Sequence, residues 1–128
     1  MVAEKDLYPI IIDHFIQKGF KCYLEVKYYS RKIDIIATKG KIIFAIEAKI
    51  ANWQKALQQA LTCKICANKV YIAMWHNFIH RIPLNKVKQY GIGLLEIDGN
   101  VKEIIKPKKS KLFYKPVSEE VLQRAGRN

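Results

Sequence analysis

The sequence predicts an α/β domain in which helices flank a central mixed β-sheet. The chain has 128 residues, half of them hydrophobic, which is enough for one domain with a proper core. Short runs rich in Ile predict strands, and segments with apolar residues three or four positions apart predict helices. No apolar run reaches the length of a membrane span, and the N-terminus lacks the basic and apolar regions of a signal peptide. We therefore expect a cytoplasmic protein.

The elements follow in the order helix, three strands, helix, strand, helix and two strands. Gly40 and Asp98-Gly99 mark two hairpin turns between strands. The strands on either side of the second helix are joined by a crossover, so these two strands should be parallel. The expected ranges are helices 3–18, 52–67 and 84–90, and strands 20–29, 33–38, 42–50, 69–75, 93–97 and 101–105.

The composition of the chain changes near residue 106. Residues 106–115 carry five lysines and no acidic residue, and Ser118 then begins a short helix expected over 118–125. We therefore divide the chain into a main domain, 1–106, and a basic C-terminal extension, 107–128.

Three charged residues lie inside the apolar runs of the hairpin at 33–50: Asp34, Glu47 and Lys49. Buried charge is costly unless it is paired or holds a metal. A two-residue turn at Gly40-Lys41 would place Asp34 directly opposite Glu47, with Lys49 next on the same face as Glu47. Two carboxylates at that spacing repel each other, and a divalent cation would relieve the repulsion. The alternative interpretation is a buried ion-pair network without a metal.

These residues resemble the PD-(D/E)xK nuclease superfamily, whose core is the restriction-endonuclease-like αβββαβ fold. Asp34 is followed after 12 residues by Glu47-Ala48-Lys49 on the next strand, and residues 3–75 are expected in the same order of elements. The helix after this strand carries Gln59 at the matching position, with Cys63 where such enzymes often have an aromatic residue.

The resemblance implies roles for the residues of the site. Asp34 and Glu47 would hold Mg²⁺ or Mn²⁺ together with the backbone carbonyl of Ala48, and Lys49 would position or activate the attacking water. Gln59 completes the catalytic set. Some members add a Glu from the first helix, and Glu4 is the matching residue here. The other acid that could play this part is Glu25, on the strand before Asp34.

The expected function is therefore that of a metal-dependent DNA endonuclease. Phosphodiester cleavage needs an activated water and a counter-charge for the transition state, and a carboxylate-bound Mg²⁺ helps with both. Structure-specific cutting of junctions or flaps and single-strand cutting all fit the resemblance, and junction-resolving members imply a homodimer. The alternative is a non-catalytic nucleic-acid-binding protein with the same fold.

The charge balance also favours nucleic acid as the partner. Lys and Arg number 23 against 11 Asp and Glu, which gives a net charge of +12. The basic run near the C-terminus could hold a phosphate backbone, with Phe113 or Tyr114 packing on a base or on the domain. Alternatively, the run is solvated and its aromatic residues pack on the core. The lysines of the run are Lys106, Lys108, Lys109, Lys111 and Lys115.

A zinc-stabilised interaction domain is a third alternative. Cys63 and Cys66 together with His76 and His80 supply four potential zinc ligands. The two cysteines could equally be small buried thiols on the flank of a helix. The odd cysteine count, which includes Cys22, suggests reduced thiols.

Overall fold

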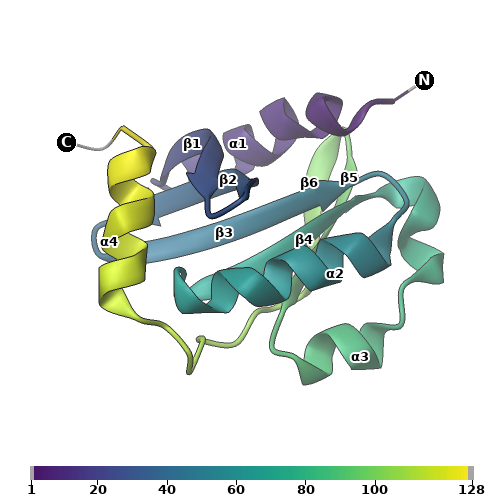
Figure 1. Cartoon of the computed structure of the whole chain (residues 1–128). Coiled ribbons are helices and arrows are strands. Elements are labelled where there is room, and N and C mark those ends of the chain that lie inside the picture. The colour runs from purple at the N-terminus through teal and green to yellow at the C-terminus, as the bar shows by residue number, and fades with distance from the viewer. Residues whose placement is uncertain (1, 127–128) are drawn as a thin grey trace.

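The computed structural model describes residues 2–126 and contains one six-stranded mixed sheet flanked by helices (Figure 1). The expected order of elements is confirmed, with short 3₁₀ turns added. The strands are β1 (Lys21–Tyr28), β2 (Arg31–Lys39), β3 (Ile42–Lys49), β4 (Lys69–Trp75), β5 (Gly93–Asp98) and β6 (Asn100–Ile105). The helices and 3₁₀ turns are η1 (Glu4–Leu7), α1 (Tyr8–Gln17), α2 (Trp53–Thr62), η2 (Cys63–Ile65), η3 (His76–Arg81), α3 (Leu84–Gln89) and α4 (Lys115–Arg124).

The strands lie in the sheet in their sequence order, from β1 to β6. β3, β4 and β5 are parallel to one another, and the remaining neighbours are antiparallel. The parallel pair expected around the second helix is therefore confirmed as β3 and β4. The C-terminal ends of the three parallel strands lie at the same end of the sheet.

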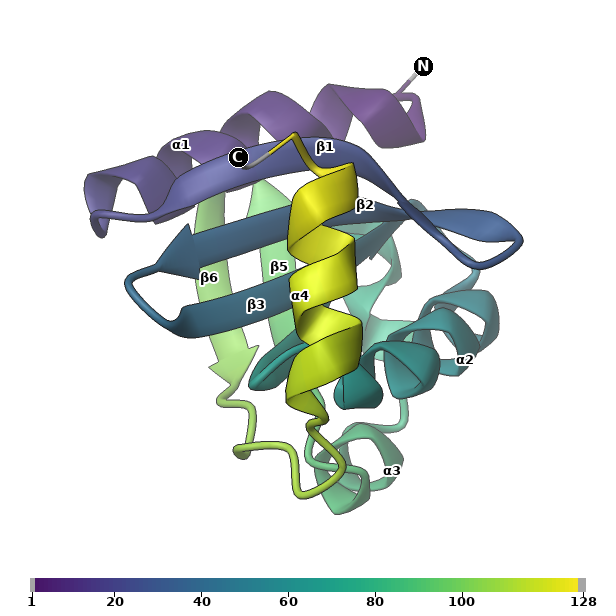
Figure 2. The same ribbon diagram turned by 60° about the vertical axis from the view of Figure 1, so that its left-hand side comes forward.

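Each face of the sheet is covered by its own helices. η1 and α1 pack on one face through Leu7, Ile11 and Phe15, which are buried. The other face is covered by α2 and α4, and Figure 2 shows α4 crossing in front of β2 and β3. Within residues 2–126 no helix is long and apolar enough to cross a membrane.

The turn between β2 and β3 has the predicted length. Lys39 pairs with Ile42, so Gly40 and Lys41 alone form the turn. Gly40 has φ +59°, a value that glycine adopts without a steric penalty, and the type II′ turn requires it at this position.

The C-terminal extension packs on the same sheet. α4 begins at Lys115, three residues earlier than expected, because Pro116 lies in its first turn, where a proline is tolerated. Val121 of this helix is buried in the cluster that also contains α2 residues. The predicted boundary at 106 and 107 follows directly after β6. Met1, Arg127 and Asn128 lie outside the described residues.

Candidate functional site

Asp34 lies where the side chains of β2 switch from one face of the sheet to the other, and β1 is irregular at the same level. Ile33 and Ile35 are two residues apart but pack into clusters on opposite faces of the sheet. The regular pairing of β1 with β2 is also interrupted there, because Glu25 and Asp34 are not paired with each other. Glu25 has φ +49°, an uncommon value for a residue other than glycine. Such local strain is often found at functional sites.

The reversal of faces changes how Asp34 meets β3. The pairing of β2 with β3 ends at Ile35 and Ile46, one residue short of the expected Asp34–Glu47 pair. Asp34 Oδ2 instead accepts a hydrogen bond from the backbone N–H of Ala48 at 2.8 Å. The expectation of a regular cross-strand pair is therefore wrong, because it assumed unbroken alternation along β2.

Glu47 is fully buried, and its two oxygens have different surroundings. Oε2 lies 2.6 Å from Nη1 of Arg31 and accepts a hydrogen bond from the Cys63 thiol at 3.4 Å. Oε1 is the buried side-chain polar atom of residues 2–126 that lacks any hydrogen-bond partner. Burial and then the negative charge of Asp34 raise the pKa of Glu47 to about 7, although Arg31 acts in the opposite direction.

Arg31 is a member of the site that the sequence did not reveal. It was expected in a loop, but it begins β2 and reaches the end of α2. Its Nη2 donates to the backbone oxygen of Gln59 at 2.9 Å and to Oγ1 of Thr62 at 2.8 Å. The C-terminal end of a helix favours a cation. A buried carboxylate demands a nearby cation, but sequence spacing alone cannot say which of the many basic residues supplies it.

Lys49 and Glu4 form the more exposed side of the site. Lys49 Nζ lies 3.2 Å from Oε1 of Glu4, and the two side chains are 19% and 34% exposed. Glu4, which the resemblance matched to an acid of the first helix, comes from η1. Glu25, the other candidate acid, instead lies 3.7 Å from the exposed Lys5.

Two further residues differ from the expected arrangement. Tyr8 packs beside Asp34, and burial followed by the Asp34 charge raises the pKa of Tyr8, which therefore stays a neutral phenol. Gln59 is near the site only through its backbone oxygen. Within residues 2–126 its side chain makes no hydrogen bond to Asp34, Glu47 or Lys49.

The donor atoms at the site are those that Mg²⁺ and Mn²⁺ prefer. Asp34 and Glu47 offer carboxylate oxygens, and the unpartnered Oε1 of Glu47 is the atom that a metal would satisfy. Among the described residues no group of three or more His, Cys, Asp or Glu side chains is arranged to hold a metal. A metal here would therefore take its remaining ligands from the Ala48 carbonyl, water or substrate.

The residues of the zinc alternative contact separate partners. Cys63 contacts Glu47, whereas His76 Nε2 lies 3.4 Å from Oδ1 of Asp98. A hydrogen bond with Cys66, followed by burial, raises the pKa of Cys63.

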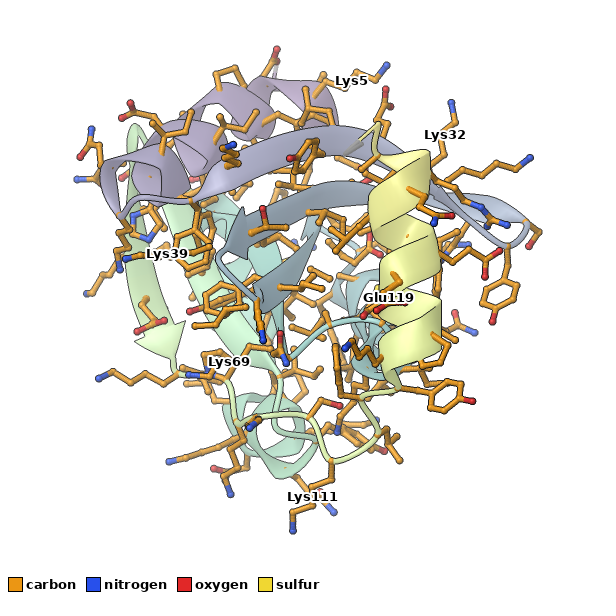
Figure 3. The ribbon with its side chains drawn as sticks, turned by 90° about the vertical axis from the view of Figure 1, so that its left-hand side faces the viewer. Lys5, Lys32, Lys39, Lys69, Lys111 and Glu119 are labelled. Atoms are coloured by element: carbon orange, nitrogen blue, oxygen red, sulfur yellow. The ribbon has the colours of Figure 1, made fainter. Side chains whose placement is uncertain are left out.

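The five lysines of the C-terminal run do not act as one group. Lys108, Lys109 and Lys111 line one hollow, and Figure 3 shows Lys111 projecting from the end of the molecule. Lys115 lines another groove and lies 3.8 Å from Glu119. The fifth lysine, Lys106, is exposed and lines neither hollow. Phe113 packs against the core, as expected if the aromatic residues of the run cover the domain, whereas Tyr114 is 58% exposed.

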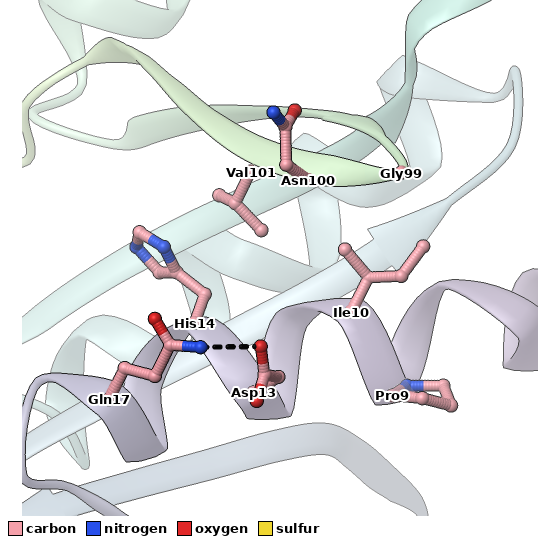
Figure 4. A pocket seen from close by; sticks show the side chains of 8 residues that line it. All are labelled: Pro9, Ile10, Asp13, His14, Gln17, Gly99, Asn100 and Val101. Atoms are coloured by element: carbon pink, nitrogen blue, oxygen red, sulfur yellow. Dashed lines mark hydrogen bonds between the residues drawn. The ribbon is translucent and has the colours of Figure 1, made fainter.

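Another hollow lies away from these residues, between α1 and the turn joining β5 to β6 (Figure 4). Its volume is ≈ 440 Å³, and it contains none of the predicted site residues. Gln17 donates to Asp13 across its floor at 2.8 Å.

Comparison with known proteins supports the fold. The chain matches no family model, and no curated protein matches its sequence. Its structure is similar to that of SPO1766, a protein of unknown function from Silicibacter pomeroyi, with a TM-score of 0.79 and 15% identity over 98% of this chain and 85% of that one. A structure of Pyrococcus furiosus SfsA in complex with Ca²⁺ matches with a TM-score of 0.44 and 12% identity, over 77% of this chain and 60% of that one. The mixed α/β fold is therefore shared with another protein along nearly the whole chain.

Proposed function

We propose that this protein is a divalent-metal-dependent DNA endonuclease with a restriction-endonuclease-like core of the PD-(D/E)xK type. The observation that carries the proposal is the unpartnered Oε1 of the buried Glu47, close to a second carboxylate, Asp34. A buried carboxylate oxygen without a donor is costly, and a cation is the partner that suits it best. Lys49 and the net charge of +12 add the basic groups that a phosphodiester substrate requires.

Each residue has a distinct part in this proposal. Asp34 and Glu47 would hold Mg²⁺ or Mn²⁺, together with the Ala48 carbonyl. Such an ion supplies counter-charge for the phosphate and favours ionisation of the attacking water. Lys49 orients that water and the scissile phosphate, because its amine lies at the more exposed side of the site. Glu4 positions the amine of Lys49.

Two neighbours prepare the carboxylates for this task. Tyr8 is a neutral phenol beside Asp34 and can donate to its carboxylate. Arg31 compensates the charge of Glu47 through Oε2 and leaves Oε1 free. Gln59 remains a predicted catalytic residue whose backbone oxygen anchors Arg31.

The test is a cleavage assay with a panel of DNA substrates in the presence of Mn²⁺. The panel contains duplex, single strand, flap and four-way junction, which also separates junction from flap cutting. Wild-type protein should cut at least one of them, and Asp34→Ala and Lys49→Ala should abolish cutting while DNA binding survives. Variants that cut as well as the wild type would show that the site is wrongly assigned.

The second candidate is a non-catalytic nucleic-acid-binding protein with the same fold. The observation that favours it is Arg31, which already gives Glu47 a cation at 2.6 Å. In that case the charged residues form an ion-pair network. Mg²⁺ and Mn²⁺ would then leave the stability of the protein unchanged, and no substrate in the panel would be cut.

Two further proposals concern the setting of the protein. The three cysteines are free thiols, which supports a reducing compartment such as the cytoplasm. A homodimer stays a prediction from the resemblance to junction-resolving enzymes.

A further inference from the structure

Acidic residues are absent from two long segments that meet in the structure. No Asp or Glu occurs from Ala48 to Leu95 or from Ile104 to Ser118. The excess positive charge therefore lies in these two segments, which include η2, α3 and the loop that follows β6.

The loop after β6 is fixed to the domain. Lys108 N–H donates to the oxygen of Gly91 at 2.9 Å, and Ser110 N–H donates to the oxygen of Asn68 at 2.7 Å. The hydroxyl of Ser110, which is buried, donates to the oxygen of Lys64 at 2.6 Å. These bonds hold the backbone in place, so the lysines of the loop are presented at set positions.

Four lysines surround one hollow at this place: Lys64, Lys108, Lys109 and Lys111. The hollow has a volume of ≈ 260 Å³, and no acidic residue lines it. Like charges held together repel, and an anion between them relieves the repulsion. The fixed loop therefore maintains an arrangement that favours bound phosphate.

The same surface exposes apolar side chains. Tyr90 and Leu112 line the hollow, and they are 39% and 60% exposed. Ile65 and Tyr114 are 40% and 58% exposed, and a backbone hydrogen bond of 2.7 Å joins these two residues. Four of the nine exposed large hydrophobic residues within 2–126 thus lie on or beside the basic hollow.

The combination of lysines and exposed apolar side chains selects a single strand over a duplex. A duplex turns its phosphates outward and stacks its bases inside, so contact with its backbone would leave Tyr114 and Leu112 in water. A single strand also offers the faces of its bases, and each base that stacks on an aromatic side chain contributes about 1–3 kcal/mol.

We infer that the hollow between η2, α3 and the loop 106–114 is a binding site for single-stranded nucleic acid. Phosphates lie among the four lysines, and bases pack on Tyr114 and its apolar neighbours. The inference rests on the proposed function, because it names the class of substrate that the nuclease would hold.

The binding site lies at the opposite end of the parallel strands from the candidate catalytic residues. Asn68, which receives the loop, precedes β4, and Phe44 of β3 pairs with Lys69 there. From Phe44 to Lys49 the strand rises ~17 Å at ~3.3 Å per residue. A nucleic-acid strand that keeps the stacked spacing of ~3.4 Å per nucleotide therefore needs on the order of five nucleotides to reach both places.

The test measures binding by fluorescence anisotropy in EDTA, so that no cleavage occurs. The probes are a single strand of about 15 nucleotides, a length that one small domain can cover, and a duplex of equal length. The first variant carries Lys108→Gln, Lys109→Gln and Lys111→Gln. The matched control carries Lys21→Gln, Lys27→Gln and Lys32→Gln, which remove the same charge from exposed positions on β1 and β2.

We expect the wild type to bind the single strand at least about tenfold more tightly than the duplex. The loop variant should lose at least about tenfold in affinity, and its salt dependence should fall by about two units of slope, since each lost phosphate contact removes ~0.7. The control should lose clearly less. A second variant, Leu112→Ser with Tyr114→Ser, should weaken single-strand binding and leave duplex binding unchanged.

Three results would overturn the inference. Equal losses in the two triple variants would mean that total charge, not the hollow, governs binding. Equal affinity for single strand and duplex would remove the role of the apolar residues. Binding to vesicles rich in anionic lipid, lost in the loop variant and without binding to either oligonucleotide, would assign the surface to a membrane.

If Asp34→Ala binds the single strand normally but the wild type cuts nothing with Mn²⁺, the inference stands and the proposed function fails.

Discussion

Replacement of Glu47 by Gln tests whether this carboxyl is as perturbed as its surroundings imply. The substitution keeps the shape of the side chain and removes its charge. Its pKa is about 7 in the folded protein against an ordinary value of 4.5, mainly because the side chain is buried. A raised carboxyl pKa means that the fold favours the protonated form. The free energy of unfolding should therefore fall as pH rises from 4.5 to 7.

The size of the effect follows from the same two values. Each pKa unit corresponds to about 1.4 kcal/mol, so a difference of about 2.5 units gives about 3 kcal/mol. The contribution is fully present below pH 4.5 and fully lost above pH 7. Glu47→Gln lacks this titration, so it should gain about 2.5 kcal/mol relative to the wild type between pH 5 and pH 8.

The assay is urea unfolding in EDTA at pH 5 and pH 8, followed by tryptophan fluorescence. The quantity of interest is the difference between variant and wild type, because other groups titrate equally in both. Glu119→Gln, at an exposed position on α4, serves as the control and should show no change with pH. If the difference for Glu47→Gln is the same at both pH values, the account of the buried carboxyl is refuted.

Three further predictions concern neighbouring features. Arg31→Met should destabilise the protein by about 3–5 kcal/mol at pH 8 and by less at pH 5, where Glu47 can take a proton. The control, Arg81→Met at a surface position, should have little effect in the same urea titration. Gly93→Ala should lower the melting temperature, because a Cβ atom there would lie 2.6 Å from an aromatic ring of β4; an unchanged melting temperature would contradict this packing. Glu4→Gln should reduce cleavage about tenfold while changing stability by less than about 1 kcal/mol, and unchanged cleavage would remove Glu4 from the site.

The sequence predicted the elements and the turn that bring the site together. Gly40, between two apolar runs, favours a tight hairpin turn, and the crossover around the second helix requires the strands on either side of it to be parallel. These local and topological rules placed Asp34 and Glu47 on neighbouring strands. The resemblance pointed to Glu4 and left Glu25 as the other candidate acid, and the structure places Glu4, not Glu25, beside Lys49.

Two details of the site could not be predicted, because no sequence pattern indicates them. The reversal of faces at Asp34 coincides with Glu25 on the neighbouring strand, whose positive φ is unusual for that residue type. The partner of Glu47 is Arg31, and its position is set by α2, which lies far along the chain. Alternation rules assume regular strands, so they fail where a strand turns over.

Direct measurement of Mn²⁺ binding by titration calorimetry, without nucleic acid, tests the central claim that Asp34 and Glu47 form a metal site. The wild type should bind Mn²⁺, and Asp34→Asn and Glu47→Gln should each weaken that binding at least about tenfold, since each removes a ligand. The exposed Glu119→Gln should bind as the wild type does. Absence of binding to the wild type, or equal binding by all three variants, would contradict the claim.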